Sequence, residues 1–166
     1  MSHISRSKTE ILMDIIIDRM YAEDIHEVIE IEKAAFSNPW ENEMFYSSLE
    51  HYYCWKLFEK TANRIIGYMI GEKVMDEFSI HNLAISSKYQ RQGLGSWFTR
   101  NIINDMRDYG VRVFFLEVRR SNKAAFCLYE SLGFKEIYVR KGYYSYPAED
   151  AIVMMMDERN TKKDNL

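Results

Sequence analysis

The spacing of apolar positions changes along the chain, and each change marks a boundary between expected elements. In the first half most apolar runs have the spacing of strands, and two helical stretches flank Pro39, which a helix interior does not accept. The expected elements of this half are a strand over residues 14–20, helices over 22–35 and 41–49, and strands over 52–58, 65–74 and 77–85. Because the turns between the last three strands are short, we expect an antiparallel meander.

Strands and helices alternate in the second half. Apolar side chains recur at helical spacing from Leu94 to Met106, and Gly110 ends that helix. The other expected elements are a strand over 111–118, a helix over 122–131 that Gly133 ends, and strands over 134–141 and 151–156, with a loop between them that carries Gly142, Tyr143 and Tyr144. A strand, a helix and a strand in succession predict a right-handed crossover with parallel pairing, and ligands bind beyond the carboxyl ends of such strands.

Together these elements predict an α/β fold, in which a mixed sheet of about seven strands is flanked by about four helices. The 166-residue length suits one domain with a proper core. We expect this domain to cover residues 14–157, after a flexible extension over 1–13 and before a flexible charged tail over 158–166.

Composition narrows the class of protein. The net charge of −3 argues against a surface dedicated to nucleic acid. Cys54 and Cys127 fall in an expected strand and an expected helix, and their spacing fits no disulfide framework and no metal site, so we expect reduced thiols and no metal. The apolar run Ile15–Ile17 is too short for a signal peptide, and no run approaches transmembrane length. These features predict a cytoplasmic protein with no membrane partner.

The segment Tyr89–Ser96 joins an apolar strand to a helix and contains two glycines. Gly93 and Gly95 lack Cβ atoms, so a ligand can approach backbone N–H groups there. The positive end of the following helix and the charge of Arg91 favour an anion at the same place. The segment is therefore a candidate phosphate-binding loop; the alternative is a glycine-rich turn before a helix.

Two nucleotide motifs are excluded at this loop. A Walker loop has Lys and then Ser or Thr after its last glycine, whereas Ser96 and Trp97 follow Gly95 here. A dinucleotide fingerprint requires a third glycine near position 98, which is Phe98. The order Gln90-Arg91-Gln92-Gly93-Leu94-Gly95 instead resembles the acyl-CoA pyrophosphate loop of the GCN5-related N-acetyltransferases (GNAT).

Two further residues are candidates for chemistry. Glu117 interrupts an apolar strand, where a lone carboxylate is costly to bury, so it acts either as a general base or as the salt-bridge partner of Arg112, Arg119 or Arg120. Tyr129 lies on the next helix and is either a core aromatic or a catalytic phenol. Asn122 stands where it caps that helix.

Several segments jointly resemble one branch of the GNAT superfamily, the RimI-type ribosomal protein alanine N-acetyltransferases. They are Phe36–Trp40, Leu83–Ile85, Arg91–Ser96, Leu116–Arg119 with Ser121 and Asn122, Leu128–Phe134, Arg140–Tyr144 and Glu149–Ala151. The chain departs from the usual pattern at Ser86-Ser87, at Gly142 and at His81, all outside the expected cofactor contacts. The resemblance covers residues 15–156 and implies a GNAT fold.

The resemblance also implies a role for each segment. Glu117 corresponds to the proton acceptor and Tyr129 to the proton donor of the departing thiolate. The acetyl-CoA contacts correspond to Leu83, Ala84, Ile85, Arg91, Gln92, Gly93, Leu94, Gly95, Ser96 and Asn122, and the substrate contacts to Phe36, Trp40, Tyr143 and Tyr144. The implied activity is acetylation of the N-terminal alanine of a small-subunit ribosomal protein, with acetyl-CoA as co-substrate. Two alternatives stay open: an acetyltransferase for other amines, and a non-catalytic acyl-CoA-binding module.

Overall fold

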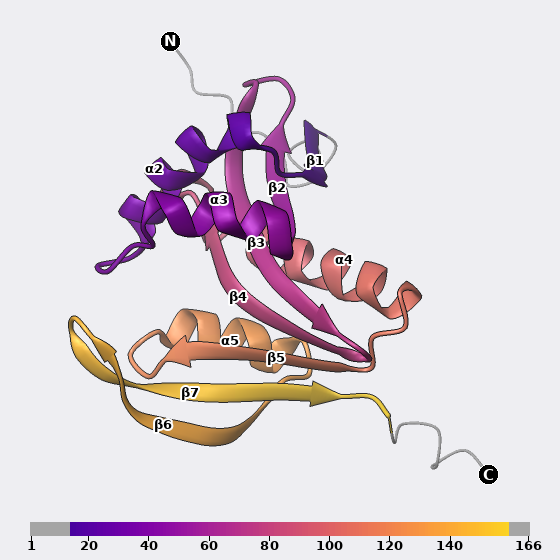
Figure 1. Cartoon of the computed structure of the whole chain (residues 1–166), viewed down its shortest axis with the longest axis vertical. Helices are drawn as coiled ribbons and strands as arrows, with labels where there is room; N and C mark the ends of the chain where they lie inside the picture. The colour runs from indigo at the N-terminus through magenta and orange to yellow at the C-terminus, as the bar shows by residue number, and fades with distance from the viewer. Residues whose placement is uncertain (1–13, 160–166) are drawn as a thin grey trace.

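A computed structural model describes residues 14–159, in which seven strands and four α-helices form three layers (Figure 1). The strands are β1 Ile15–Arg19, β2 Tyr53–Glu59, β3 Arg64–Val74, β4 Glu77–Ile85, β5 Val113–Arg119, β6 Lys135–Ser145 and β7 Ala148–Asp157. The helices are α2 Ile25–Ala35, α3 Asn42–His51, α4 Leu94–Asp108 and α5 Lys123–Ser131, with short 3-10 turns at Ala22–Asp24 and Ser87–Tyr89. The predicted extension over 1–13 and the predicted tail over 158–166, from residue 160 onward, lie outside the described residues.

All strands belong to one sheet in the order β1-β2-β3-β4-β5-β7-β6, in which only β4 and β5 are parallel. Their pairing is confined to Glu77–Ile80 and Val113–Leu116. Beyond these residues the two strands diverge toward their carboxyl ends, as Figure 1 shows. The predicted antiparallel meander and the predicted parallel, splayed pair are both confirmed.

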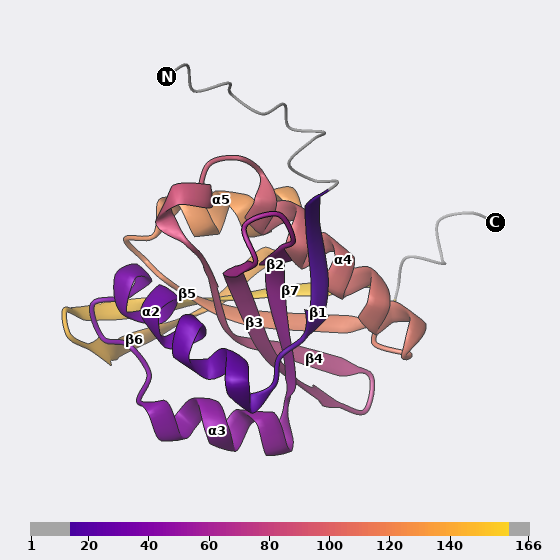
Figure 2. The same ribbon diagram turned by 90° about the horizontal axis from the view of Figure 1, so that it is seen from above.

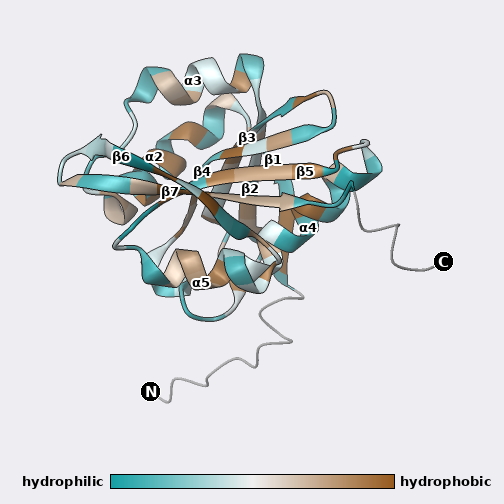
Figure 3. Cartoon of the chain, turned by 90° about the horizontal axis from the view of Figure 1, so that it is seen from below, coloured by the Kyte–Doolittle hydropathy of each residue, from teal (hydrophilic) through white to brown (hydrophobic). Residues whose placement is uncertain are grey.

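The helices cover both faces of the sheet. Viewed from above, α2 and α3 lie on one side of the strands, and α4 and α5 on the other (Figure 2). Both brown and teal segments occur on each helix in Figure 3, as expected where one face packs on the sheet and the other meets water. On α4 the buried side chains include Leu94, Phe98, Ile102, Ile103 and Met106, the apolar series that the sequence predicts. No helix within residues 14–159 is long and apolar enough to span a membrane.

The hairpin of β6 and β7 differs from its prediction. Gly142, Tyr143 and Tyr144 lie inside β6 rather than in a loop, and the chain reverses at Tyr146 and Pro147. The strand accommodates them because its register with β7 shifts between Arg140 and Tyr144, which is the signature of a bulge. Gly142 adopts a φ of 60° there, a conformation that glycine accepts at no steric cost.

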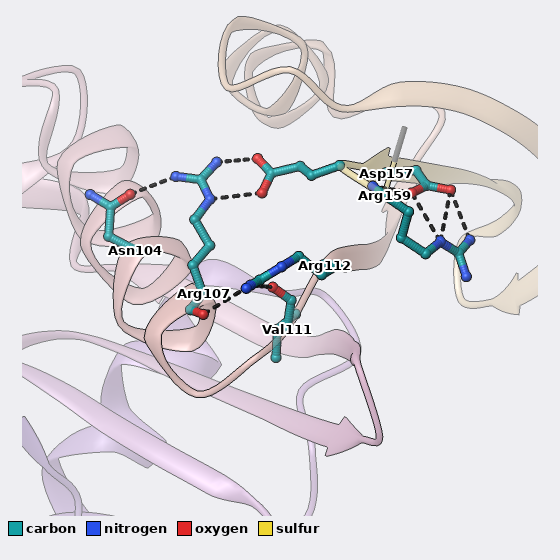
Figure 4. Close-up of polar contacts among 7 residues, drawn as sticks. Asn104, Arg107, Val111, Arg112, Asp157 and Arg159 are labelled. Carbon is teal, nitrogen blue, oxygen red and sulfur yellow. Dashed lines mark hydrogen bonds and ion pairs between the residues drawn. The ribbon is translucent and has the colours of Figure 1, made fainter. Parts of the chain in front are cut away.

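The segment just after β7 contacts the residue that precedes β5 and the end of α4 (Figure 4). The backbone N–H of Glu158 donates to the carbonyl of Arg112 at 2.9 Å, and the Glu158 carboxylate pairs with Arg107 at the end of α4. Arg112 in turn donates to the Arg107 carbonyl at 2.9 Å, which satisfies one of the open carbonyls at the helix end. These contacts extend one residue beyond the boundary at Asp157 that we expected.

Candidate active site

A cavity of about 540 Å³ lies where β4 and β5 diverge. It brings together residues from most of the predicted groups, namely Phe36, Trp40, Leu83, Glu117, Asn122, Tyr129 and Tyr144. The other predicted residues do not line it, namely Ala84, Ile85, Arg91, Gln92, Gly93, Leu94, Gly95, Ser96 and Tyr143. The candidate base and the candidate phenol thus share one cavity, although they come from different elements.

The cavity is lined by residues from both faces of the sheet. Leu116 and Val118 of β5 pack in the core cluster that contains Tyr129 and the buried face of α4. Because successive strand residues point to opposite faces, Glu117 lies on the face covered by α2 and α3. Groups on the two faces of the sheet, Glu117 on one and Tyr129 on the other, therefore meet at the gap between the two strands.

Tyr129 is the buried phenol of the site, with 7 % of its surface exposed. Its ring meets that of Phe134 edge to face at 5.8 Å between centroids. Burial, with a smaller contribution from Tyr144, raises its pKa to about 12. The hydroxyl therefore keeps its proton throughout the neutral and mildly alkaline range and is available as a hydrogen-bond donor.

Glu117 does have an ionic partner, but it is none of the three arginines that we considered. Arg140 of β6 donates to the Glu117 carboxylate at 2.5 Å. Arg119 instead pairs with Glu149 at 3.5 Å, and Arg120 with Asp150 at 3.4 Å. Arg112 binds backbone carbonyls. Because 29 % of the Glu117 side chain is exposed, the carboxylate remains accessible from the cavity.

The two tyrosines of the bulged strand have different positions. Tyr144 is half-buried, lines the cavity and lies under the guanidinium of Arg119, 3.9 Å from the ring centroid. Burial and then the Glu117 charge raise the Tyr144 pKa to about 12. Tyr143 is exposed and outside the cavity, and its ring lies 4.1 Å from the Arg140 guanidinium. Tyr144 is thus placed to contact a substrate directly, whereas Tyr143 interacts with Glu117 and with its partner Arg140.

A buried carboxylate that we did not predict as a site residue holds the loop with Phe36 and Trp40. Glu32 of α2 is 1 % exposed and lines the cavity. It accepts hydrogen bonds from the Trp40 backbone N–H at 2.8 Å, from the Asn82 side chain at 3.2 Å and from the Tyr68 hydroxyl. The sequence does carry a signal for it, because a glutamate at an apolar position of a helical stripe must find buried donors.

His81, the unexpected imidazole of β4, also lines the cavity. Its ring stacks on Tyr52 at 5.0 Å, and Nε2 lies 3.4 Å from the Glu72 carboxylate. These contacts fit a strand residue whose nitrogen has a partner. Within the described residues, no three His, Cys, Asp or Glu side chains gather in a way that could hold a metal ion.

The predicted phosphate-binding loop ends in a glycine cap. Gly93 is the N-cap of α4, with a φ of 82°, and no side chain caps the first turn. The N–H groups of that turn thus remain available to an anion. Gly95 has a packing role as well, because a Cβ there would lie 3.1 Å from Leu128, a residue that lines the cavity. The loop is therefore adjacent to the cavity wall.

Replacing Gly93 with alanine is expected to weaken acetyl-CoA binding about tenfold, because a side chain at positive φ costs about 1–2 kcal/mol and shifts the loop. Isothermal titration calorimetry measures this change. Gly110→Ala is the matched control: Gly110 also has a positive φ, 87°, and a Cβ there would meet nothing within 4 Å. Both variants should lose stability, and only Gly93→Ala should lose affinity. An equal loss in both would contradict a role of the Gly93 loop in binding.

Comparisons with known proteins identify the family. A model described as the acetyltransferase (GNAT) family matches residues 25–134. The bS18 ribosomal protein alanine N-acetyltransferase of Escherichia coli K12 is 37 % identical over 143 residues, which are 84 % of this chain and 95 % of that protein. The chain belongs to the GNAT family of acetyltransferases. The enzyme of the same name from Haemophilus influenzae is 39 % identical over 143 residues, covering 84 % of this chain and 96 % of its own length.

The GNAT fold is also evident from solved structures. The crystal structure of the Escherichia coli S18 alanine N-acetyltransferase superposes with a TM-score of 0.81 at 35 % identity, covering 92 % of this chain and 98 % of that one. The predicted GNAT fold and the resemblance to the alanine N-acetyltransferases are therefore confirmed. GNAT acetyltransferases use acetyl-CoA, and one GNAT protein of similar fold, from Elizabethkingia anophelis, was solved with acetyl-CoA bound.

Proposed function

We propose that this GNAT enzyme transfers the acetyl group of acetyl-CoA to the N-terminal alanine of ribosomal protein bS18. The substrate follows from the relatives in Escherichia coli and Haemophilus influenzae, whose names state this activity. The observation that carries the chemistry is the meeting of Glu117 and Tyr129 in one cavity beside the glycine-capped start of α4. Each of the three groups that the reaction needs, a base, a thiolate stabiliser and a phosphate site, then has a candidate.

The proposed acetyl-CoA contacts run from the start of α4, past the end of β4, to the start of α5. The pyrophosphate would lie at the start of α4, where the N–H groups from Gly93 to Ser96 and the charge of Arg91 favour an anion. The pantetheine arm would then follow Leu83–Ile85, the end of β4 that pairs with β3 but not with β5, and Asn122 would contact the coenzyme from the start of α5. A backbone N–H of this end of β4 would stabilise the oxyanion that forms at the thioester carbonyl.

Glu117 is the proposed base for the amine. An α-amine with a pKa near 8 is about one-tenth neutral at pH 7, so deprotonation costs only about 1.4 kcal/mol, whereas a lysine near 10.4 costs about 4.6 kcal/mol. A carboxylate, acting directly or through one water, is therefore sufficient for an N-terminal amine. The neutral nitrogen attacks the thioester carbon and forms the N–C bond, which gives a tetrahedral oxyanion, and the C–S bond then breaks as the thiolate leaves. The nitrogen loses two protons, one before and one after the attack, and Glu117 passes each in turn to solvent.

Tyr129 is the proposed partner of the departing sulfur. Because burial raises the Tyr129 pKa to about 12, full proton transfer to a thiolate of pKa near 8.5 runs uphill by about 5 kcal/mol. The hydroxyl therefore acts mainly by donating a hydrogen bond to the thiolate, which takes up its proton later. No covalent enzyme intermediate is needed, and Cys127, exposed on α5, is not assigned a role as nucleophile.

Intact-mass spectrometry of acetylated peptides tests the proposal. A peptide that begins with the bS18 alanine should gain one acetyl group in the presence of acetyl-CoA, and the same peptide with a blocked N-terminus should gain none, even where it contains lysine. Acetylation of lysines or of polyamines at equal rates would favour the broader amine acetyltransferase. No release of free CoA with any amine would contradict the proposal and favour a binding module.

A further inference from the structure

The candidate base Glu117 is held by a single cation. Arg140 is the one Lys, Arg or His residue among residues 14–159 that lies within ion-pair distance of its carboxylate. Three neighbouring cations are committed to other acids, since Arg119 pairs with Glu149, and Arg120 and Lys141 both pair with Asp150. Arg140 is therefore the specific partner of Glu117 rather than one member of a general basic patch.

The pair contributes little to the stability of the fold. About half of the Arg140 side chain is exposed, and β6 is the edge strand of the sheet. Ion pairs between partly exposed side chains are screened by water and stabilise proteins only weakly. The pair is nevertheless ordered by a second contact, because the Arg140 guanidinium lies 4.1 Å from the centroid of the Tyr143 ring. A function at the site explains this arrangement better than a structural one.

The chemistry of the amine supplies such a function. The N-terminus arrives mainly as an ammonium ion, and it must lose a proton before the nitrogen can attack. An unpaired Glu117 would attract this ammonium strongly and form an ion pair. That interaction would exist before proton transfer and vanish after it, so it would stabilise the bound substrate more than the transition state and slow turnover.

We infer that Arg140 is a positioning residue that competes with the substrate ammonium for Glu117 and so prevents a stable ion pair between substrate and base. The inference rests on the proposed function, and it adds that the positive charge of Arg140 tunes how Glu117 interacts with the bound amine. Arg140 keeps the carboxylate aimed at the cavity and offsets its charge. The nearby positive charge also disfavours the ammonium form of the bound amine relative to the neutral form. Tyr143 holds the guanidinium in this position.

The signature of this role is a combined fall of kcat and of the peptide Kd. Replacing Arg140 with glutamine should lower kcat about tenfold and tighten peptide binding about threefold, the size expected for one charge interaction at a partly exposed site. Arg140→Lys keeps the positive charge but loses the planar guanidinium that stacks on Tyr143, so both values should lie between those of Arg140→Gln and the wild type. The kinetics use an alanine-initiated peptide at saturating acetyl-CoA, and calorimetry in the presence of CoA gives the peptide Kd.

Arg120→Gln is the matched control, since it breaks an ion pair with Asp150 in which neither residue lines the cavity. It should leave both values unchanged. A merely structural role of Arg140 predicts the opposite binding result, a weaker peptide Kd, and that outcome or two unchanged values would overturn the inference. An inactive wild-type protein would instead overturn the proposed function itself, so the two failures are distinguishable.

Discussion

Replacing Glu117 with glutamine is expected to lower kcat for an alanine-initiated peptide by about a hundredfold to a thousandfold, within the usual contribution of a general base. The glutamine amide has the shape of the carboxylate, and its oxygen can still accept a hydrogen bond from Arg140. It takes up no proton at neutral pH, however, so it cannot act as a base. The cavity should therefore be unchanged. Steady-state kinetics give kcat, and calorimetry should give the same acetyl-CoA Kd for variant and wild type.

Glu136→Gln is the control for this substitution, because Glu136 is an exposed glutamate on β6 outside the cavity. It should have wild-type turnover. Full activity of Glu117→Gln would remove Glu117 as the base, and attention would then turn to a water chain or to His81, which lines the same cavity. A loss of acetyl-CoA affinity in Glu117→Gln would show instead that the substitution disturbs the cofactor site.

Most of the fold could be predicted because local pattern and tertiary structure agree. The strand β4 has the predicted bounds, 77–85, since turn residues stand at one end and the phosphate-binding loop at the other. The predicted strand ends at residue 141, whereas β6 ends at Ser145, because a glycine such as Gly142 is typical of a loop. In the structure the glycine sits in a bulge, and pairing with β7 continues beyond it. A bulge depends on the partner strand, which a single sequence does not reveal.

The site could be predicted only in part, for a similar reason. Glu117 and Tyr129 were identifiable because a carboxylate in an apolar strand and a segment typical of a family are local features. The partner of Glu117 was not identifiable, since Arg140 lies 23 positions further along and on an edge strand. The three arginines nearer in sequence have other partners: Arg119 and Arg120 pair with Glu149 and Asp150, and Arg112 donates to backbone carbonyls.

Replacing Tyr129 with phenylalanine is expected to lower kcat about a hundredfold, because the departing thiolate loses its hydrogen-bond donor. The ring and its contact with Phe134 are retained, so the melting temperature and the acetyl-CoA Kd should change little. Rapid-mixing kinetics with a thiol reagent measure the release of CoA. Tyr138→Phe, which alters a tyrosine that is 64 % exposed on β6, is the control and should have wild-type turnover.

The pH dependence separates this role of Tyr129 from that of an ordinary phenol. A Tyr hydroxyl of normal pKa near 10 would lose its proton, and its ability to donate, as the pH approaches 10. Because burial raises the Tyr129 pKa to about 12, the wild-type kcat should show no alkaline decline between about pH 7 and pH 10. A decline of kcat in that pH range that disappears in Tyr129→Phe would mean that the Tyr129 hydroxyl ionises at a lower pH than its burial predicts. Equal kcat for Tyr129→Phe and the wild type would mean that the thiolate leaves without help from Tyr129.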